Sequence, residues 1–305
     1  MQRKLKIVYM GTPEFAVPAL EKLIHSDFEV VGVVTAPDKP AGRGLKLKFS
    51  PVKEAALKHN LPVLQPEKLK DEAFLNELKE LGTNLIVVVA FRMLPELIWS
   101  FPEYGTFNLH ASLLPYYRGA APINWAIING ETETGLTTFF LKKKIDTGDL
   151  IMQEKEPITK EDTAGTLYER LMSKGADVVL KTIELIAENK YQLTPQQEPD
   201  IPKPAPKIFR EDCEIDFSKT SEEVYNFIRG LSPYPAAWTD ILGKTCKIFS
   251  AQVVTENIES KDTFVTDQKS FLYIKTANGY ISLKELQPAG KKKMPIDAFL
   301  RGNKV

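Results

Sequence analysis

Short apolar runs alternate with amphipathic segments along the first 190 residues of this 305-residue chain. Runs of this kind, apolar throughout rather than at every second position, are typical of strands buried on both faces of a sheet. The clearest runs are 5–10, 29–35 and 84–91, and segments with helical periodicity separate them at 13–26, 51–59 and 71–81. The alternation predicts a doubly wound, Rossmann-like α/β domain with a mostly parallel sheet covered by helices on both faces.

Residues 36–50 interrupt this alternation, because they are rich in Pro, Gly and Lys. Such a composition predicts a loop. An irregular segment of this length inside a compact domain is usually functional or disordered. Basic residues, among them Arg43, Lys46 and Lys48, give it a local positive charge.

A second change of composition divides the chain, because five prolines fall within 190–206. Prolines at that density prevent a helix and favour an extended, semi-rigid linker. We therefore expect a first domain over 1–189, a linker over 190–206 and a second domain over 207–305. Beyond the linker the sequence predicts one helix at 221–231 and strands at 246–254, 270–276 and 280–286. Short strands joined by turns favour a small, antiparallel, OB-like barrel.

Charge and cysteine content exclude several classes of protein. Forty basic residues balance forty acidic ones, so the chain does not coat nucleic acid by bulk charge. Two cysteines, Cys213 and Cys246, are too few for a disulfide framework or a zinc site of their own, and we expect no bound metal. No segment resembles a signal peptide or a membrane span, so we expect a cytoplasmic protein without a membrane partner.

The common motifs of cofactor and nucleophile chemistry are missing. The loop after the first expected strand has one glycine, Gly11, where a dinucleotide fingerprint needs three closely spaced small residues. There is no phosphate-binding P-loop, no HExxH zinc motif and no GxSxG nucleophile motif. An enzyme built on this chain would act without a nicotinamide cofactor and without an obvious protein nucleophile.

An amide and an imidazole lie toward the carboxyl end of the strand expected at 106–110. Asn108 and His110 are two residues apart, so both side chains leave the strand on one face. Ligands of open α/β sheets bind beyond the carboxyl ends of the strands, where these residues lie. The other histidines, His25 and His59, fall near the ends of expected helices and favour a solvated role.

Two carboxylates are candidates to assist His110. Asp146 and Asp149 belong to the sequence IDTGD, in a loop between two expected strands. A carboxylate near His110 would hold the ring tautomer and improve the ring as a proton acceptor. The spacing along the chain does not decide which of the two lies there.

These residues belong to longer motifs that resemble the folate-dependent formyltransferases. The motifs are SLLPYYRGAAPI at 112–123, Asn108 with His110, and DTGD at 146–149. Further stretches extend the resemblance over the chain: 10–13, 37–44, 161–163, 215–217, 233–238 and 286–292. The PAGRG sequence at 40–44 and the C-terminal part of the chain resemble, within this family, the members that act on aminoacylated initiator tRNA.

The resemblance implies transfer of a formyl group from 10-formyltetrahydrofolate to the α-amine of methionyl-initiator tRNA, for translation initiation. It implies that His110 moves the amine proton, that Asn108 donates to the developing oxyanion, and that Asp146 orients and charges His110. The nucleophile then belongs to the substrate. No obligate protein partner is implied.

The same resemblance assigns the binding residues. The folate would lie against Ser112, Leu113, Leu114, Pro115, Val89 and Phe91. The acceptor stem of the tRNA would meet Arg43, Lys46 and Lys48. One stretch departs from the family pattern: the sequence Ala90-Phe91-Arg92 lacks the glycine that usually follows, so the pterin pocket is expected to differ locally.

Two other classes of function stay open at this point. A sugar-nucleotide N-formyltransferase or a formyl-folate hydrolase would keep Asn108, His110 and Asp146. A non-catalytic RNA-binding or folate-binding protein would have no use for them. The basic segment around Arg43 and the sequence LQPAGKK at 286–292 favour an RNA acceptor, although 207–305 has only fifteen basic residues against thirteen acidic ones.

Overall fold

The computed structural model describes residues 3–41 and 46–305. The chain forms two compact units. An N-terminal unit consists of residues 1–119, 135–156 and 169–204, and a C-terminal unit consists of 120–134, 157–168 and 205–305. Within the described residues, every helix is too short or too polar to span a lipid bilayer.

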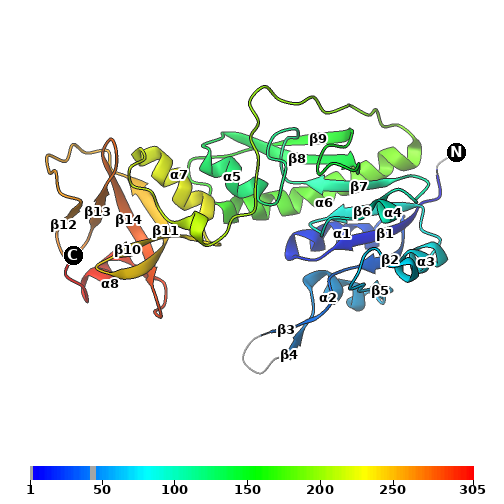
Figure 1. Cartoon of the computed structure of the whole chain (residues 1–305), viewed down its shortest axis with the longest axis horizontal. Coiled ribbons are helices and arrows are strands. Elements are labelled where there is room, and N and C mark those ends of the chain that lie inside the picture. Colours follow the sequence, from blue (N-terminus) through cyan, green and yellow to red (C-terminus); the bar gives the residue numbers. More distant parts are fainter. Residues whose placement is uncertain (1–2, 42–45) are drawn as a thin grey trace. The chain divides into compact units, whose positions relative to one another are not determined.

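A seven-stranded sheet forms the centre of the N-terminal unit (Figure 1). Its strands, in spatial order, are β5 (Val63–Leu64), β2 (Glu29–Val34), β1 (Lys6–Gly11), β6 (Leu85–Val89), β7 (Thr106–His110), β8 (Glu133–Phe140) and β9 (Leu150–Pro157). The first five run parallel to their neighbours, and β8 is antiparallel to β7. This confirms the predicted, mostly parallel sheet.

Helices cover both faces of this sheet. Against one face, α3 (Glu72–Glu80) and α4 (Glu96–Trp99) bury Val8, Met10, Ile86 and Val88. On the other face, the long helix α6 (Ala164–Glu188) approaches β7 so closely that a Cβ on Gly175 would lie 2.9 Å from the Leu109 side chain. The remaining elements are η1 (Glu14–Ala16), α1 (Val17–Ile24) and α2 (Pro51–Lys58).

The strand order reverses between β1 and β6. The chain winds outward from β1 through β2 to β5, then returns to β6 on the other side of β1 and continues to β7. At such a reversal the connections leave in opposite directions, and a crevice opens beyond the carboxyl ends of the strands. Asn108 and His110 lie at that edge, on β7.

The C-terminal unit is built on an antiparallel sheet. Its order is β10 (Ala237–Ile241), β11 (Lys244–Val253), β14 (Tyr280–Pro288), β13 (Leu272–Lys275) and β12 (Phe264–Thr266), with β15 (Met294–Pro295) paired to β14. Helices α5 (Pro122–Ile128), η2 (Glu211–Cys213), α7 (Ser221–Leu231) and α8 (Ile296–Leu300) complete it. Apolar residues of α7, α8 and the strands, among them Ile228, Leu283 and Phe299, form one core. The predicted β-rich module is confirmed.

The segment 36–50 differs from the expected loop. It contains a short antiparallel pair, β3 (Lys39–Ala41) and β4 (Lys46–Lys48). Polar contacts hold Asp38 at the base of the pair: Lys53 and Gln65 both donate to the Asp38 carboxylate, and these hydrogen bonds lower the pKa of that group. Because the base is held closed, the two flanks lie within reach of each other's backbone.

The proline-rich segment is hydrogen-bonded to the N-terminal unit. Thr194 and Leu150 exchange two backbone hydrogen bonds of 2.9 and 3.0 Å, which attach the segment to the first residue of β9. Residues up to 204 belong to the N-terminal unit. Extended backbone leaves its polar groups unpaired, so it readily bonds to a neighbouring strand.

Candidate active site

β7 brings Asn108 and His110 to the carboxyl edge of the sheet. Asn108 is the register partner of Val88, so its side chain lies on the face covered by α3 and α4, and His110 follows on the same face. His110 is 7% exposed, whereas Asn108 is half-buried. Among the described residues, nothing forms a hydrogen bond with the Asn108 side-chain amide, which therefore keeps its donors for a ligand.

The two ring nitrogens of His110 have different partners. Nε2 lies 2.8 Å from the backbone oxygen of Tyr117. Because a carbonyl only accepts, Nε2 carries a hydrogen and donates it. Nδ1 lies 4.0 Å from Oδ2 of Asp146. That separation is too long for a hydrogen bond, so the carboxylate acts on the ring by charge.

The loop between β8 and β9 sets the position of Asp146. Its carboxylate accepts a hydrogen bond of 3.0 Å from the Gly119 backbone N–H, and its backbone is left-handed with φ of 52°. Gly148 passes so close to β8 that an added Cβ would lie 1.6 Å from the Phe140 carbonyl oxygen. Asp149 pairs instead with Lys142, at 2.8 Å. The structure thus places Asp146, and not Asp149, beside His110.

Two residues that the sequence did not single out hold the loop after β7. Thr137 on β8 donates to the Ser112 carbonyl at 2.6 Å and accepts from the Leu114 backbone N–H at 3.2 Å. Gln153 on β9 donates to the Leu114 carbonyl at 2.9 Å. Both are single polar residues within strands, a position that carries no recognisable motif.

The residues expected to meet a folate differ in accessibility. Val89 is fully buried and Leu114 is 3% exposed. The side chains of Leu113, Pro115 and Phe91 are each partly accessible at the ends of β6 and β7. The Ser112 hydroxyl is already used, since it donates to the Tyr116 carbonyl at 2.7 Å. Ser112 therefore shapes the loop.

The stretch that departs from the family pattern has its own anchor. Arg92 donates to the backbone oxygens of Pro66 and Glu67, so this side chain ties the end of β6 to a neighbouring loop. Ala90 adopts a left-handed backbone with φ of 48°. The chain thus turns at Ala90 without a glycine, and the hydrogen bonds of Arg92 hold this turn in place.

The basic residues expected to meet RNA are described only in part. Arg43 lies outside the described residues, as does the side chain of Lys46. Lys48 is exposed on β4, opposite the exposed Lys39 of β3. Two lysines therefore face solvent on this pair of strands.

Metal-ligating side chains do not gather anywhere in the described residues: no group of three or more His, Cys, Asp or Glu is placed to hold a metal ion. Cys213 and Cys246 are both buried, and burial raises the pKa of each thiol.

The geometry places an imidazole, a carboxylate and an amide at one edge of a Rossmann-like sheet, and comparison with known proteins assigns the class of the protein. The formyl transferase family model matches residues 4–183, and the model of the formyl transferase C-terminal domain matches 207–304. The chain belongs to the formyltransferase family.

Curated relatives are similar over almost the whole length. A methionyl-tRNA formyltransferase of Bacteroides fragilis is 52% identical over 307 residues, covering 98% of this chain and 95% of the relative. One of Flavobacterium johnsoniae is 50% identical over 303 residues, covering 98% of this chain and 96% of the relative. Both units of the chain are therefore included in the similarity.

Solved structures share the fold at lower identity. A sugar 3N-formyl transferase, WlaRD, solved with dTDP and 5-N-formyl-THF, has a TM-score of 0.69 and 24% identity, covering 95% of this chain and all of that one. HypX from Aquifex aeolicus, solved with tetrahydrofolic acid, has a TM-score of 0.63 and 17% identity, covering 98% of this chain and 47% of that one. At these identities the likeness concerns the fold alone.

Proposed function

We propose that this chain transfers the formyl group of 10-formyltetrahydrofolate to the α-amine of methionyl-initiator tRNA, giving N-formylmethionyl-tRNA for translation initiation. The observation that carries the proposal is the identity of 50–52% to methionyl-tRNA formyltransferases over 98% of the chain. Since charged initiator tRNA is a cytoplasmic molecule, the proposal places the reaction in the cytoplasm.

The site supplies a proton acceptor and a charge to stabilise it. The folate supplies an activated formyl group, and the tRNA-bound amine attacks its carbon. A new carbon–nitrogen bond forms while the bond to the folate nitrogen breaks. The amine must lose a proton, and the leaving nitrogen must gain one. Because Nε2 of His110 is occupied by Tyr117, Nδ1 is the nitrogen that takes the amine proton.

Asp146 and Asn108 stabilise the charges that this transfer creates. Proton uptake makes the His110 ring positive. The negative Asp146 carboxylate, 4.0 Å away in a largely buried setting, stabilises that positive charge. The formyl oxygen becomes negative as the amine attacks. The Asn108 amide, which is half-buried and on the same face, is suited to donate to this oxygen.

The residues around the site suit the face of a flat ring. Leu113 and Pro115 follow β7, Phe91 follows β6, and these strands are neighbours in the sheet. Their accessible apolar surfaces suit the pterin ring of a folate. Ser112 and Leu114 would act through the shape of the loop, and Val89 through its backbone, because their side chains are buried.

The tRNA would be held by charge on the segment 36–50. Arg43, Lys46 and Lys48 are the proposed contacts, and Lys39 lies opposite Lys48 on the paired strand. Phosphate contacts of this kind make the affinity fall steeply with salt. No observation favours a sugar acceptor, since WlaRD shares only the fold with this chain.

The proposal is tested with the purified full chain and 10-formyltetrahydrofolate. The acceptors are methionyl-initiator tRNA, uncharged tRNA, free methionine and an amino-sugar nucleotide. We expect rapid formylation of the charged tRNA only. Release of tetrahydrofolate without a formylated product, or faster formylation of the sugar, would contradict the proposal.

A further inference from the structure

Gln196, in the proline-rich segment, has a side-chain amide with every polar atom engaged. Nε2 donates to the backbone oxygens of Asp146 and Gly148, at 3.0 and 2.8 Å. Oε1 accepts from Nη2 and Nε of Arg118, at 2.7 and 3.2 Å. One side chain therefore connects the loop after β7 with the loop between β8 and β9.

The turn that Gln196 holds is conformationally unfavourable by itself. Asp146 is a non-glycine residue in the left-handed region, which persists only where the surroundings enforce it. Gln196 donates hydrogen bonds to the backbone carbonyls of Asp146 and of Gly148, two positions later. With the backbone fixed on both sides, the Asp146 carboxylate is aimed at Nδ1 of His110 and at the Gly119 N–H.

The same segment holds the other partner of His110. The Tyr117 backbone N–H donates to the Lys203 carbonyl at 2.6 Å, and the Tyr117 carbonyl accepts from Nε2 of His110. Arg118 is fixed further by Glu198, at 2.9 and 3.0 Å, and the Arg118 guanidinium lowers the pKa of that carboxyl. Both sides of the imidazole are thus tied to residues 196–203.

We propose that Gln196 is a positioning residue for formyl transfer: by holding the Asp146 turn against the Arg118 loop, it sets the separation between His110 and Asp146. The inference rests on the proposed function. Gln196 forms no hydrogen bond with His110 or with the carboxylate of Asp146. The effect of Gln196 on the site therefore passes through the Asp146 backbone. Misplacement of a catalytic group by about 1 Å can cost up to about a hundredfold in rate.

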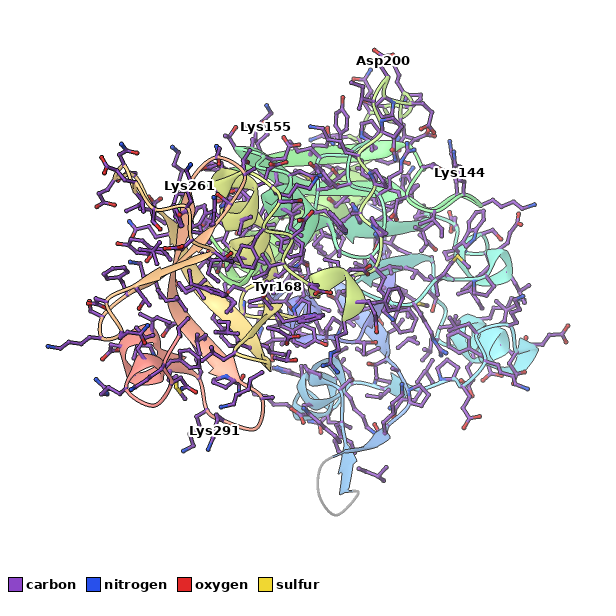
Figure 2. The ribbon with its side chains drawn as sticks, turned by 60° about the vertical axis from the view of Figure 1, so that its left-hand side comes forward. Lys144, Lys155, Tyr168, Asp200, Lys261 and Lys291 are labelled. Carbon is purple, nitrogen blue, oxygen red and sulfur yellow. The ribbon has the colours of Figure 1, made fainter. Side chains whose placement is uncertain are left out.

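The test is the variant Gln196→Glu, which keeps the shape and the acceptor for Arg118 but removes both donors. We expect kcat for methionyl-tRNA to fall about tenfold, with the KM of each substrate within about twofold. Gln197→Glu is the matched control, since this neighbour is exposed, and it should keep the full rate. Asp200→Asn is a second control, because Asp200 points outward from the segment (Figure 2).

A double-mutant cycle separates positioning from general support of the fold. If Gln196 acts through Asp146, then Gln196→Glu has no further effect on kcat in an Asp146→Asn background. Independent losses that multiply would overturn the inference, as would a kcat within twofold of the wild type for Gln196→Glu. If Gln196→Glu folds poorly, Gln196→Ala is measured in its place, because this variant introduces no charge. It should show the same loss of kcat.

The two proposals fail in different ways. A wild-type chain that does not formylate methionyl-tRNA refutes the proposed function. A wild-type chain that does so, together with fully active Gln196→Glu and Gln196→Ala variants, refutes only the role of Gln196.

Discussion

The site of the N-terminal unit and the antiparallel module of the C-terminal unit differ in the sequence separation of many of their polar contacts. At the site, hydrogen bonds join residues far apart in sequence: Arg118 and Gln196 are 78 positions apart, and Gln196 and Asp146 are 50 apart. In the module, many polar contacts are local, such as Thr220 with Glu223 and Asp267 with Ser270, three positions apart. The contacts of Gln196 hold the loops that carry the proposed reactive groups, whereas the local contacts of the module stabilise turns and a helix end.

The largest effect is expected at the imidazole. His110→Gln keeps a donor for the Tyr117 carbonyl but removes the proton acceptor, so kcat should fall about a thousandfold. Circular dichroism should show an unchanged fold. His25→Ala, at an exposed helix end, is the control and should keep the wild-type rate. A rate within tenfold of the wild type for His110→Gln would assign proton transfer to another residue.

A smaller loss is expected at Asn108, the proposed donor to the oxyanion. Asn108→Ala removes an amide that bonds to nothing else in the described residues, so kcat should fall about a hundredfold while the melting temperature stays nearly the same. Steady-state formyl transfer and a thermal scan measure both. Loss of stability in place of activity would mean that Asn108 belongs to the fold.

Gly148→Ala tests the Asp146 loop without touching a reactive group. The added methyl would meet the Phe140 carbonyl at 1.6 Å, so the loop must shift and carry Asp146 away from His110. We expect kcat to fall between about tenfold and a hundredfold. Gly302→Ala, where a Cβ meets nothing within 4 Å, is the matched control. Equal rates for both variants would show that the loop position does not limit transfer.

In the C-terminal module we expect a substitution to lower the stability and to leave kcat unchanged. Thr220 caps α7 and exchanges hydrogen bonds with Glu223 in a capping box. Thr220→Ala should lower the free energy of unfolding by about 1 kcal/mol and leave kcat unchanged. Urea unfolding measures this, with the exposed Thr255→Ala as control. A loss of kcat without a loss of stability would remove the distinction between the two regions.

The same difference explains what the sequence could predict. The helix α7 matches its expected range because its cap and its apolar periodicity are local signals. The parallel strands were recognisable from their apolar runs for the same reason. The interpretation of 36–50 as a plain loop was wrong, because it contains the antiparallel pair of β3 and β4. Asp38, at the base of this pair, is held by Lys53 and Gln65, which lie outside the segment.

The site was predictable only in part. Asn108 and His110 share a strand, so their common face followed from spacing. The choice of Asp146 over Asp149 depends on a turn between two strands, and from the residues alone it stayed open. Thr137, Gln153 and Gln196 gave no signal, since a single glutamine or threonine is unremarkable until the fold brings it to its partners.

The most direct test of this account is the single-turnover rate of formyl transfer to methionyl-initiator tRNA for Asp146→Asn, beside Asp149→Asn. Asparagine still accepts a hydrogen bond from the Gly119 N–H, so the first variant removes the charge and little else. We expect a rate at least about a hundredfold lower for Asp146→Asn and an unchanged rate for Asp149→Asn. A loss below about tenfold for Asp146→Asn, or equal losses for the two variants, would contradict it.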